Sequence, residues 1–353
     1  MAIEPKADDA GSFVRVGIVG GGFIGRTVGG QLRAAEHARV AALVDIDEGT
    51  LESTGDALGV RPDARYERYG TMLDEEDLDA VLIGTPHTLH YEQVLAAMDH
   101  GLHVLCDKPL TTNLEDARDL VARDADREET LMVGYQRHLY RAFVEARARW
   151  LESGRVPDWI TAEISQDWVD RFEGTWRMDP DLSGGGYLYD TGSHLLDSIL
   201  WSTGLTPTAV AAEMEFVDDD RRVDGRSHVT VRFEEGTTAS VTCSGETPCM
   251  REHIHLWDAE GATYLDSKDW EANTLVEIDA ESGEHRPRLD QRDLPNKAEA
   301  FVSAVRHGEE PPATALDGLR VTAVTEAAYE SARAGGEFVA VDPGDVALDG
   351  RLS

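Results

Sequence analysis

Short apolar runs alternate with helical stretches over about the first 134 residues of the chain. Apolar runs of strand length occur at residues 14–19, 40–44, 80–83, 103–106 and 131–133. Between them, apolar residues recur at helical spacing over 23–36, 48–58, 91–100 and 113–126. Strands that alternate with helices are typical of right-handed crossovers and of a parallel sheet covered on both faces. The pattern therefore predicts an N-terminal α/β domain.

The pattern changes after Gly134. Helical spacing at 143–153 and 193–202 is followed by strand-like alternation at 209–216, 228–233, 239–244, 253–258 and 262–265. Such alternation predicts a second α/β domain with a largely antiparallel sheet. We therefore expect one domain over residues 1–134 and another over 135–353. A last long helix, about 316–334, ends at Gly335-Gly336, and it can pack within the second domain or back on the first.

The net charge of the chain argues against some classes of binding partner. The 353 residues include 68 Asp and Glu against 33 Lys and Arg, which gives a formal net charge of −35. A protein with this charge repels nucleic acid and anionic membrane surfaces, so we expect neither as a partner. The longest uncharged stretch, residues 198–212, is interrupted by Ser, Thr, Gly and Pro and does not predict a membrane span.

Other compositional features point to the cytoplasm. The N-terminus lacks the basic and apolar blocks of a secretion signal. Three cysteines, at positions 106, 243 and 249, form neither a disulfide framework nor a zinc-ligand pattern. Only four of the basic residues are lysines, and carboxylates are spread through the whole chain. Because concentrated salt screens such repulsion, we expect a protein adapted to a salt-rich cytoplasm, with an acidic mesophilic enzyme as the alternative.

The first candidate site is a glycine-rich loop between the first strand and the first helix. Gly20, Gly22 and Gly25 form a G-x-G-x-x-G motif, with Phe23 and Ile24 between the last two glycines. The first glycine allows a tight turn, the second lets a pyrophosphate approach the backbone, and the third permits close packing of helix on strand. The N-terminus of the helix then offers free N–H groups to the phosphates. We expect all five residues to contact a dinucleotide.

An acidic residue at the end of the second strand completes this motif. Asp45 lies twenty residues after Gly25, where a carboxylate accepts hydrogen bonds from the hydroxyls of the adenosine ribose. The same charge repels a 2′-phosphate, and no Arg or Lys follows directly. The sequence therefore predicts NAD as the cofactor in preference to NADP.

The second candidate site is Asp107-Lys108-Pro109 at the end of the fifth strand. Ligands of an open parallel sheet lie beyond the carboxyl ends of the strands, so Lys108 is expected to project toward the nicotinamide. Lysine is scarce in this chain, which favours a function over an ordinary surface position. An ammonium group at this place is a compact charge with an adjustable pKa.

The third candidate site follows a run of three glycines. Asp190, His194 and Asp197 are spaced so that they share one face if the segment is helical from about Tyr187. The spacing predicts an imidazole that neighbouring carboxylates orient and make more basic. A metal site is the less favoured alternative, because no further cluster of His, Asp or Glu accompanies these residues, and we expect no metal.

Together these motifs resemble the glucose–fructose oxidoreductase/inositol dehydrogenase (Gfo/Idh/MocA-type) family of nicotinamide-dependent enzymes. The resemblance runs from Val14 to about Val339 and includes the glycine loop, Thr85-Pro86-His87-x-x-His90, the segment 101–109, Trp176-Arg177 and Asp190-x-x-x-His194. It implies a Rossmann domain and a second α/β domain whose large open sheet often mediates dimer or tetramer contacts. It also implies that Lys108, Asp190 and His194 are the catalytic residues. The family usually has Glu at the position of Asp107, and residues 266–294 match no pattern.

Further contacts follow from the same resemblance. It places Thr85, Pro86, His90 and Asp107 beside the cofactor. Arg137 and Arg177, together with the three catalytic residues, are expected to contact the substrate, although a salt bridge between domains is an equal alternative for Arg137.

The combined prediction is an NAD-dependent dehydrogenase, a homodimer or homotetramer, that oxidises a secondary alcohol of a sugar, cyclitol or polyol. One alternative is a glycosidase or lyase that uses bound NAD for transient oxidation only. Another is a cofactor-binding regulator without catalysis.

Overall fold

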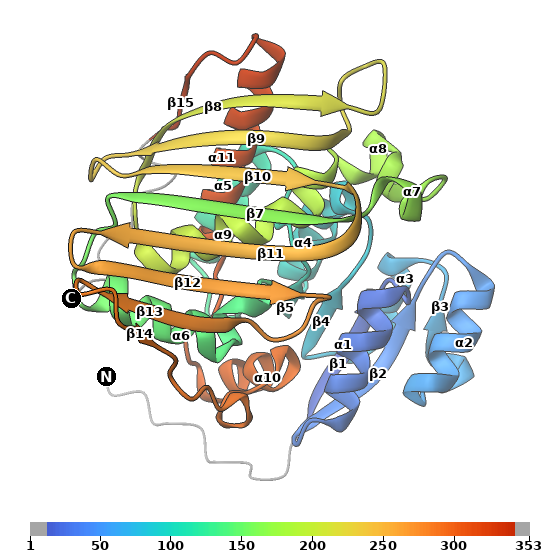
Figure 1. Ribbon diagram of the computed structural model, residues 1–353. Coiled ribbons are helices and arrows are strands. Elements are labelled where there is room, and N and C mark those ends of the chain that lie inside the picture. Colours follow the sequence, from blue (N-terminus) through green and yellow to red (C-terminus); the bar gives the residue numbers. More distant parts are fainter. Residues whose placement is uncertain (1–12, 343–353) are drawn as a thin grey trace.

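A six-stranded parallel sheet forms the N-terminal part of the molecule. The structure is a computed structural model and describes residues 13–342. The strand order is β3-β2-β1-β4-β5-β6 (Figure 1). The strands are β1 (Val14–Val19), β2 (Ala38–Val44), β3 (Arg65–Tyr66), β4 (Ala80–Ile83), β5 (His103–Cys106) and β6 (Leu131–Val133). The predicted parallel sheet is confirmed; β3 was not predicted, because two residues are too few to show an alternating pattern.

Helices cover this sheet because their apolar positions recur on one face. They are α1 (Phe23–Ala34), α2 (Glu48–Leu58), α3 (Tyr69–Glu75), α4 (His90–Asp99) and α5 (Leu114–Asp124). Asp47 accepts a hydrogen bond from Thr50 N at the start of α2, and Asn113 accepts one from Asp116 N at the start of α5. These caps fix where both helices begin. The short helix α3 was not predicted.

A nine-stranded, mostly antiparallel sheet forms the C-terminal part, as predicted. Its order is β14-β13-β12-β11-β7-β10-β9-β8-β15. The strands are β7 (Trp159–Asp167), β8 (Pro207–Phe216), β9 (Asp224–Phe233), β10 (Thr238–Ser244), β11 (Glu246–Asp258), β12 (Gly261–Lys268), β13 (Thr274–Asp279), β14 (Glu284–His285) and β15 (Val339–Ala340). The central strand β7 runs parallel to β10 and antiparallel to β11. It was missed, although buried Ile160, Ala162 and Ile164 alternate in it with less buried residues.

Helices pack on one face of this sheet, and no helix of the described chain covers the other face (Figure 1). The helices of this part are α6 (Arg141–Arg147), which continues as a π-helical turn over Ala148–Glu152, the short α7 (Val169–Phe172) and α8 (Pro180–Ser183), α9 (Ser193–Thr203), α10 (Lys297–His307) and α11 (Ala315–Arg333). Helix α11 contacts α5 and β6 as well as α9 and β8, so it packs on both parts of the molecule. Helix α10, which was not predicted, packs on α1.

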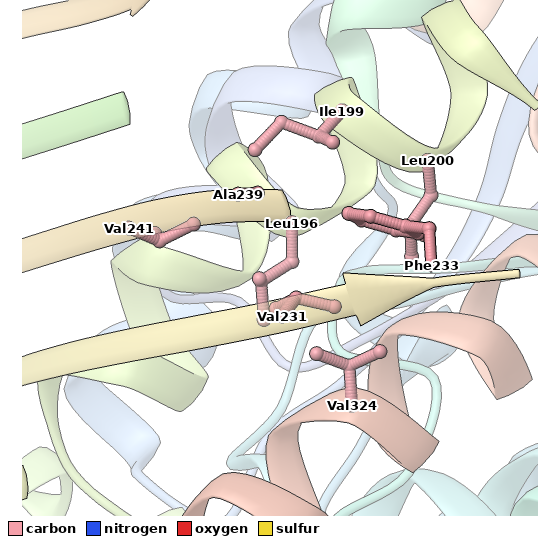
Figure 2. Close-up of a pocket in the computed structure, with 8 residues that line it drawn as sticks. All are labelled: Leu196, Ile199, Leu200, Val231, Phe233, Ala239, Val241 and Val324. Carbon is pink, nitrogen blue, oxygen red and sulfur yellow. The ribbon is translucent and has the colours of Figure 1, made fainter. Parts of the chain in front are cut away.

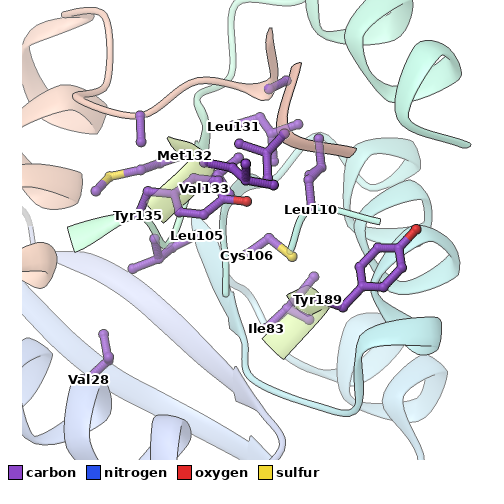
Figure 3. Packing of buried hydrophobic residues seen from close by; sticks show 14 of the residues in the cluster. Val28, Ile83, Leu105, Cys106, Leu110, Leu131, Met132, Val133, Tyr135 and Tyr189 are labelled. Atoms are coloured by element: carbon purple, nitrogen blue, oxygen red, sulfur yellow. The ribbon is translucent and has the colours of Figure 1, made fainter. Parts of the chain in front are cut away.

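The hydrophobic core is continuous between the two sheets. Figure 2 shows a small apolar cavity where α9 and α11 meet strands β9 and β10, lined only by aliphatic and aromatic side chains such as Leu196, Phe233 and Val324. Figure 3 shows the core around β4, β5 and β6, with Leu110 and Tyr189 at its edge. Tyr189 directly precedes Asp190. The core therefore fixes the segment that carries the third candidate site against the first sheet.

None of the helices within residues 13–342 is long and apolar enough to cross a membrane. The predicted boundary at residue 134 falls directly after β6, and it stays a prediction.

Candidate functional site

The glycine loop has the conformation that its sequence demands. Gly20 follows β1 with a φ of +88°, which is a left-handed conformation that favours glycine. A Cβ atom on Gly25 would lie only 1.9 Å from the carbonyl oxygen of Gly20, so only glycine allows α1 to begin this close to the strand. The space around Gly22 is open, and no side chain caps the N-terminus of α1. The N–H groups of this helix are therefore available to an anionic ligand.

Asp45 lies beside this loop at the end of β2. Its carboxylate accepts hydrogen bonds from Gly21 N at 2.7 Å and from Asp47 N at 2.9 Å. It borders a cleft of about 1130 Å³. The lining includes Gly20, Gly22, Phe23, Asp45, Ile46, Glu67, Tyr69, Thr85, Pro86, Leu89 and Trp176. The lining residues include two acidic side chains, Asp45 and Glu67, and no basic one.

The turn after β4 closes one side of the cleft. Thr85 and Pro86 line the cleft, and the Thr85 hydroxyl donates a hydrogen bond to Gln93. His90, which was expected beside the cofactor, is fully buried, with its ring nitrogens 2.7 Å from Pro109 O and 3.0 Å from Thr85 O. His90 therefore ties the turn after β4 to the turn after β5.

Lys108 reaches from the first sheet to the segment of the third candidate site. It follows β5, precedes Pro109 through a cis peptide bond, and is 9% exposed. Its ammonium group donates hydrogen bonds to the backbone carbonyl and to Oδ1 of Asp190, the latter at 3.0 Å. An ammonium group has three donors, so one of them remains available to a ligand.

The Asp190 carboxylate is the centre of a buried charge cluster. Oδ2 accepts hydrogen bonds from Trp168 Nε1 at 2.6 Å and from Arg177 Nε at 3.1 Å, and His87 Nε2 lies 3.6 Å from Oδ1. Burial would raise the pKa of Asp190, but Lys108, His87 and Arg177 together hold it well below its ordinary value. The carboxylate is therefore ionised, and it positions Lys108 and Arg177. Neither His87 nor Trp168 was among the predicted site residues.

The prediction that neighbouring carboxylates orient His194 and make it more basic is wrong. The chain forms a π-helical turn over Leu188–Gly192 before α9 begins, which changes the helical phase on which the prediction rested. Neither Asp190 nor Asp197 is hydrogen-bonded to His194, and its buried Nδ1 has no hydrogen-bond partner among residues 13–342. Burial and the charges of Arg137, Lys108 and Lys297 lower its pKa well below the ordinary value, so the imidazole is less basic, not more.

Asp197 and Arg137 are committed to other buried partners. Asp197 lies 2.9 Å from Nε2 of His138. Arg137 forms a buried ion pair with Glu252 of β11 and donates to the Ser198 hydroxyl at 3.3 Å. The structure therefore favours an ion-pair role for Arg137 over the predicted contact with substrate, but both partners lie in the second part of the chain, so this ion pair is not the expected one between domains. Its charge still acts on the site, because it lowers the pKa of His194.

A second lysine, Lys297, lies at the start of α10. Its ammonium group is 3.4 Å from Asp107, and it lines a separate cavity of about 1070 Å³ with Phe23, Ile24, Gln136 and Asn296. Asp107 thus pairs with a lysine that the sequence analysis did not select, although the scarcity of lysine could have identified it. The two large cavities meet at Phe23.

No group of three or more His, Cys, Asp or Glu residues within the described part of the chain could hold a metal ion.

Comparisons with known proteins agree with this geometry. The family described as an oxidoreductase family with an NAD-binding Rossmann fold matches residues 14–135, and the GFO/IDH/MocA C-terminal domain matches 145–261. A D-xylose 1-dehydrogenase (NADP(+)) of Haloferax volcanii is 31% identical over 90% of this chain and 97% of its own. A 1,5-anhydro-D-fructose reductase of Ensifer adhaerens is 29% identical over 91% of this chain and 97% of its own.

A solved structure agrees as well. The aldose-aldose oxidoreductase from Caulobacter crescentus, complexed with glycerol, superposes with a TM-score of 0.80 at 25% identity, covering 93% of this chain and 99% of that one. The chain therefore belongs to the Gfo/Idh/MocA oxidoreductase family and has an N-terminal NAD(P)-binding Rossmann domain.

Proposed function

We propose that this protein is an NAD-dependent dehydrogenase that oxidises a secondary alcohol of a sugar, cyclitol or polyol. The observation that carries the proposal is the convergence of Lys108, from the first sheet, with Asp190 and the neighbouring His194, from the second part of the chain. This convergence lies at the carboxyl end of the parallel sheet, where such folds bind ligands. The names of the relatives, a D-xylose dehydrogenase and an aldose-aldose oxidoreductase, support a sugar as the substrate.

Each residue of the site has a separate role in the oxidation of the alcohol. A nicotinamide cofactor supplies the hydride acceptor when it is bound. Lys108 donates its remaining hydrogen bond to the reacting oxygen and polarises it. His194 accepts the hydroxyl proton, because its imidazole is neutral and its ring nitrogens are free of protein carboxylates. Asp190 keeps Lys108 and Arg177 in place. Arg177 remains partly exposed and is offered to a substrate hydroxyl.

The preference for NAD is a separate part of the proposal. Asp45 is fixed by two backbone donors at the ribose end of the cleft, and Glu67 adds a second carboxylate there. A 2′-phosphate would meet these charges without a cation to neutralise it. The Haloferax volcanii relative is named for NADP(+), so relatives of this chain differ in the cofactor they use.

The uncovered face of the nine-stranded sheet supports self-association into a homodimer or homotetramer. Trp159 and Trp257 stack on it with ring centres 5.2 Å apart, and Tyr264 packs against Trp257. An apolar aromatic group on a face without helices favours contact with a second copy. Sedimentation equilibrium tests this, and a monomer at all concentrations would contradict it.

Reduction of NAD in the presence of a panel of sugars and polyols tests the dehydrogenase. The proposal predicts that NADH accumulates with at least one sugar. Conversion of a sugar without net NADH would instead indicate a glycosidase or lyase that oxidises transiently. Binding of NAD without any conversion would indicate a regulator.

A further inference from the structure

The loop between β12 and β13 places an exposed tryptophan beside His194. Trp270 is 48% exposed, and its ring lies 6.3 Å from the His194 ring, nearly edge-on at 68°. Other aromatic residues, such as Phe13, are exposed as well, so it is the position beside the His194 imidazole that distinguishes Trp270. Trp270 belongs to residues 266–294, which match no sequence pattern.

The backbone of this loop is strained. Asp269 and Trp270 both have positive φ values, of 51° and 61°. Two successive residues other than glycine in the left-handed region cost about 1–2 kcal/mol each. Such strain persists only where surrounding contacts impose it, and it is often found at ligand-binding sites.

Those contacts connect the loop to the catalytic centre. Asn273, at the end of the loop, is 7% exposed and donates to Glu252 at 3.1 Å. Glu252 pairs with Arg137, whose charge lowers the pKa of His194. Further support comes from Glu271, whose carbonyl accepts a hydrogen bond from the Ser267 hydroxyl at 2.9 Å. These contacts hold the loop that carries Trp270 next to the Arg137–Glu252 ion pair.

We propose that Trp270 is a substrate-binding residue that stacks on the carbon face of a ring-shaped sugar or cyclitol and thereby selects cyclic substrates over open-chain polyols. This inference rests on the proposed dehydrogenase and deepens it. A pyranose or cyclitol has a compact face of C–H groups, which covers an indole ring and removes apolar area from water. An open-chain polyol has no such fixed face, and it loses conformational entropy on binding. The imidazole beside the indole then meets a hydroxyl at the edge of the ring.

Steady-state kinetics of Trp270→Ala, Trp270→Phe and wild type test this. The ring-shaped probes are D-xylose, D-glucose and myo-inositol, and xylitol and D-sorbitol are the open-chain counterparts. We expect Trp270→Ala to raise KM for the best cyclic substrate about tenfold or more, since 1.4 kcal/mol corresponds to a factor of ten. The value of kcat should change less than about threefold, and Trp270→Phe should recover most of the loss. KM for any open-chain substrate should hardly change.

Phe13→Ala is the matched control. Phe13 is an exposed aromatic residue directly before β1, whereas the cleft lies at the other end of this strand. Its replacement by Ala should therefore leave KM unchanged. An unchanged KM for the cyclic substrate in Trp270→Ala would overturn the inference while leaving the dehydrogenase intact. A wild-type enzyme that reduces no NAD would overturn the proposed function instead. Calorimetric titration of the NADH complex with the same sugars would then test the role of Trp270. Equal affinity in wild type and Trp270→Ala, or no binding of any cyclic sugar, would contradict substrate binding by Trp270.

Discussion

Buried positive charge determines which side chain of the site can accept a proton. Asp190 is surrounded by Lys108, Arg177, His87 and Trp168, so its lone pairs are used and its pKa is held low. His194 is four residues away, and burial together with the charges of Arg137, Lys108 and Lys297 favours its neutral form. A neutral imidazole is a proton acceptor, whereas an ionised carboxylate with a full set of donors is a positioning group.

We predict that kcat/KM for alcohol oxidation rises with pH through a pKa that is unusually low for a histidine. Because the pKa of His194 is lowered, the midpoint of this rise should lie below the value of about 6.5 that is ordinary for histidine. His194→Asn should lower kcat about 10²–10⁴-fold and remove this rise, with the Kd of NAD unchanged. Stopped-flow and steady-state rates over pH measure both. A His194→Asn enzyme with wild-type kcat/KM would assign the proton transfer to another group, Lys108 first.

The cofactor preference depends on Asp45. Wild type should use NAD with a higher kcat/KM than NADP, and Asp45→Ala should reduce that ratio about 10–100-fold, because hydrogen bonds from ribose hydroxyls to a carboxylate are lost and a repulsive charge is removed. Asp47→Asn is the control, since it removes a charge two residues away while an amide oxygen can still accept from Thr50 N. A wild-type preference for NADP would contradict this account.

At the scale of elements, the segment that carries Asp190 is fixed by a buried network. The Tyr329 hydroxyl of α11 accepts from Gly186 N at 2.7 Å and donates to Asp224 of β9, which also accepts from Leu188 N at 3.1 Å. Burial raises the pKa of Asp224 to about 6. Helix α11 and strand β9, which are distant in sequence, thus hold Gly186 and Leu188 at the start of the π-helical turn that carries Asp190.

This network predicts a pH-dependent stability. A carboxyl group whose folded-state pKa is raised stabilises the fold below its unfolded-state pKa of about 4, and that stability is lost as the pH rises through 6. Asp224→Asn cannot ionise, so its free energy of unfolding relative to wild type should increase by about 2–3 kcal/mol between pH 4 and pH 7. Guanidinium chloride unfolding at both pH values measures it. A difference that does not vary with pH would rule out a desolvated carboxylate at this position.

Much of the fold could be predicted from local patterns, and the site only in part. The β1–α1 loop is specified by residues adjacent in sequence, so its form follows from Gly20 and Gly25 alone. The contacts of Asp190 with Lys108 and Trp168 join three distant segments, and no periodicity contains them. The prediction that His194 shares a helix face with Asp190 and Asp197 assumed a regular α-helix. The π-helical turn over Leu188–Gly192 breaks that regularity, and no sign of it appears in the local sequence. Trp270 lies in a segment without a readable pattern, and only its tertiary neighbours show its position. Lys297 begins α10, and its contact with Asp107 joins two distant segments.

At the scale of the whole molecule, acidic residues exceed basic ones by 35, so many carboxylates lack a basic partner. The exposed ion pairs that do form, such as Arg226 with Glu215 and Glu246, contribute little each in dilute salt. Repulsion among the remaining carboxylates weakens the compact state, and salt screens it.

We therefore predict that the melting temperature rises by about 5 °C or more between 0.1 M and 3 M KCl, as the Debye length shrinks from about 10 Å to below 3 Å. Differential scanning calorimetry measures the shift. Sucrose at matched osmolarity is the control, because it favours compact states without screening charge. Equal melting temperatures at the two KCl concentrations would remove the salt-adapted interpretation.

Transfer of a deuterium label tests the central claim most directly. A sugar that the enzyme oxidises is labelled on the carbinol carbon and incubated with NAD, and the products are analysed by mass spectrometry. The account predicts one labelled NADH for each oxidised sugar, because the hydride passes to a cofactor that leaves the enzyme. Label that stays in the sugar product while NAD is not consumed would contradict it and would establish transient oxidation instead.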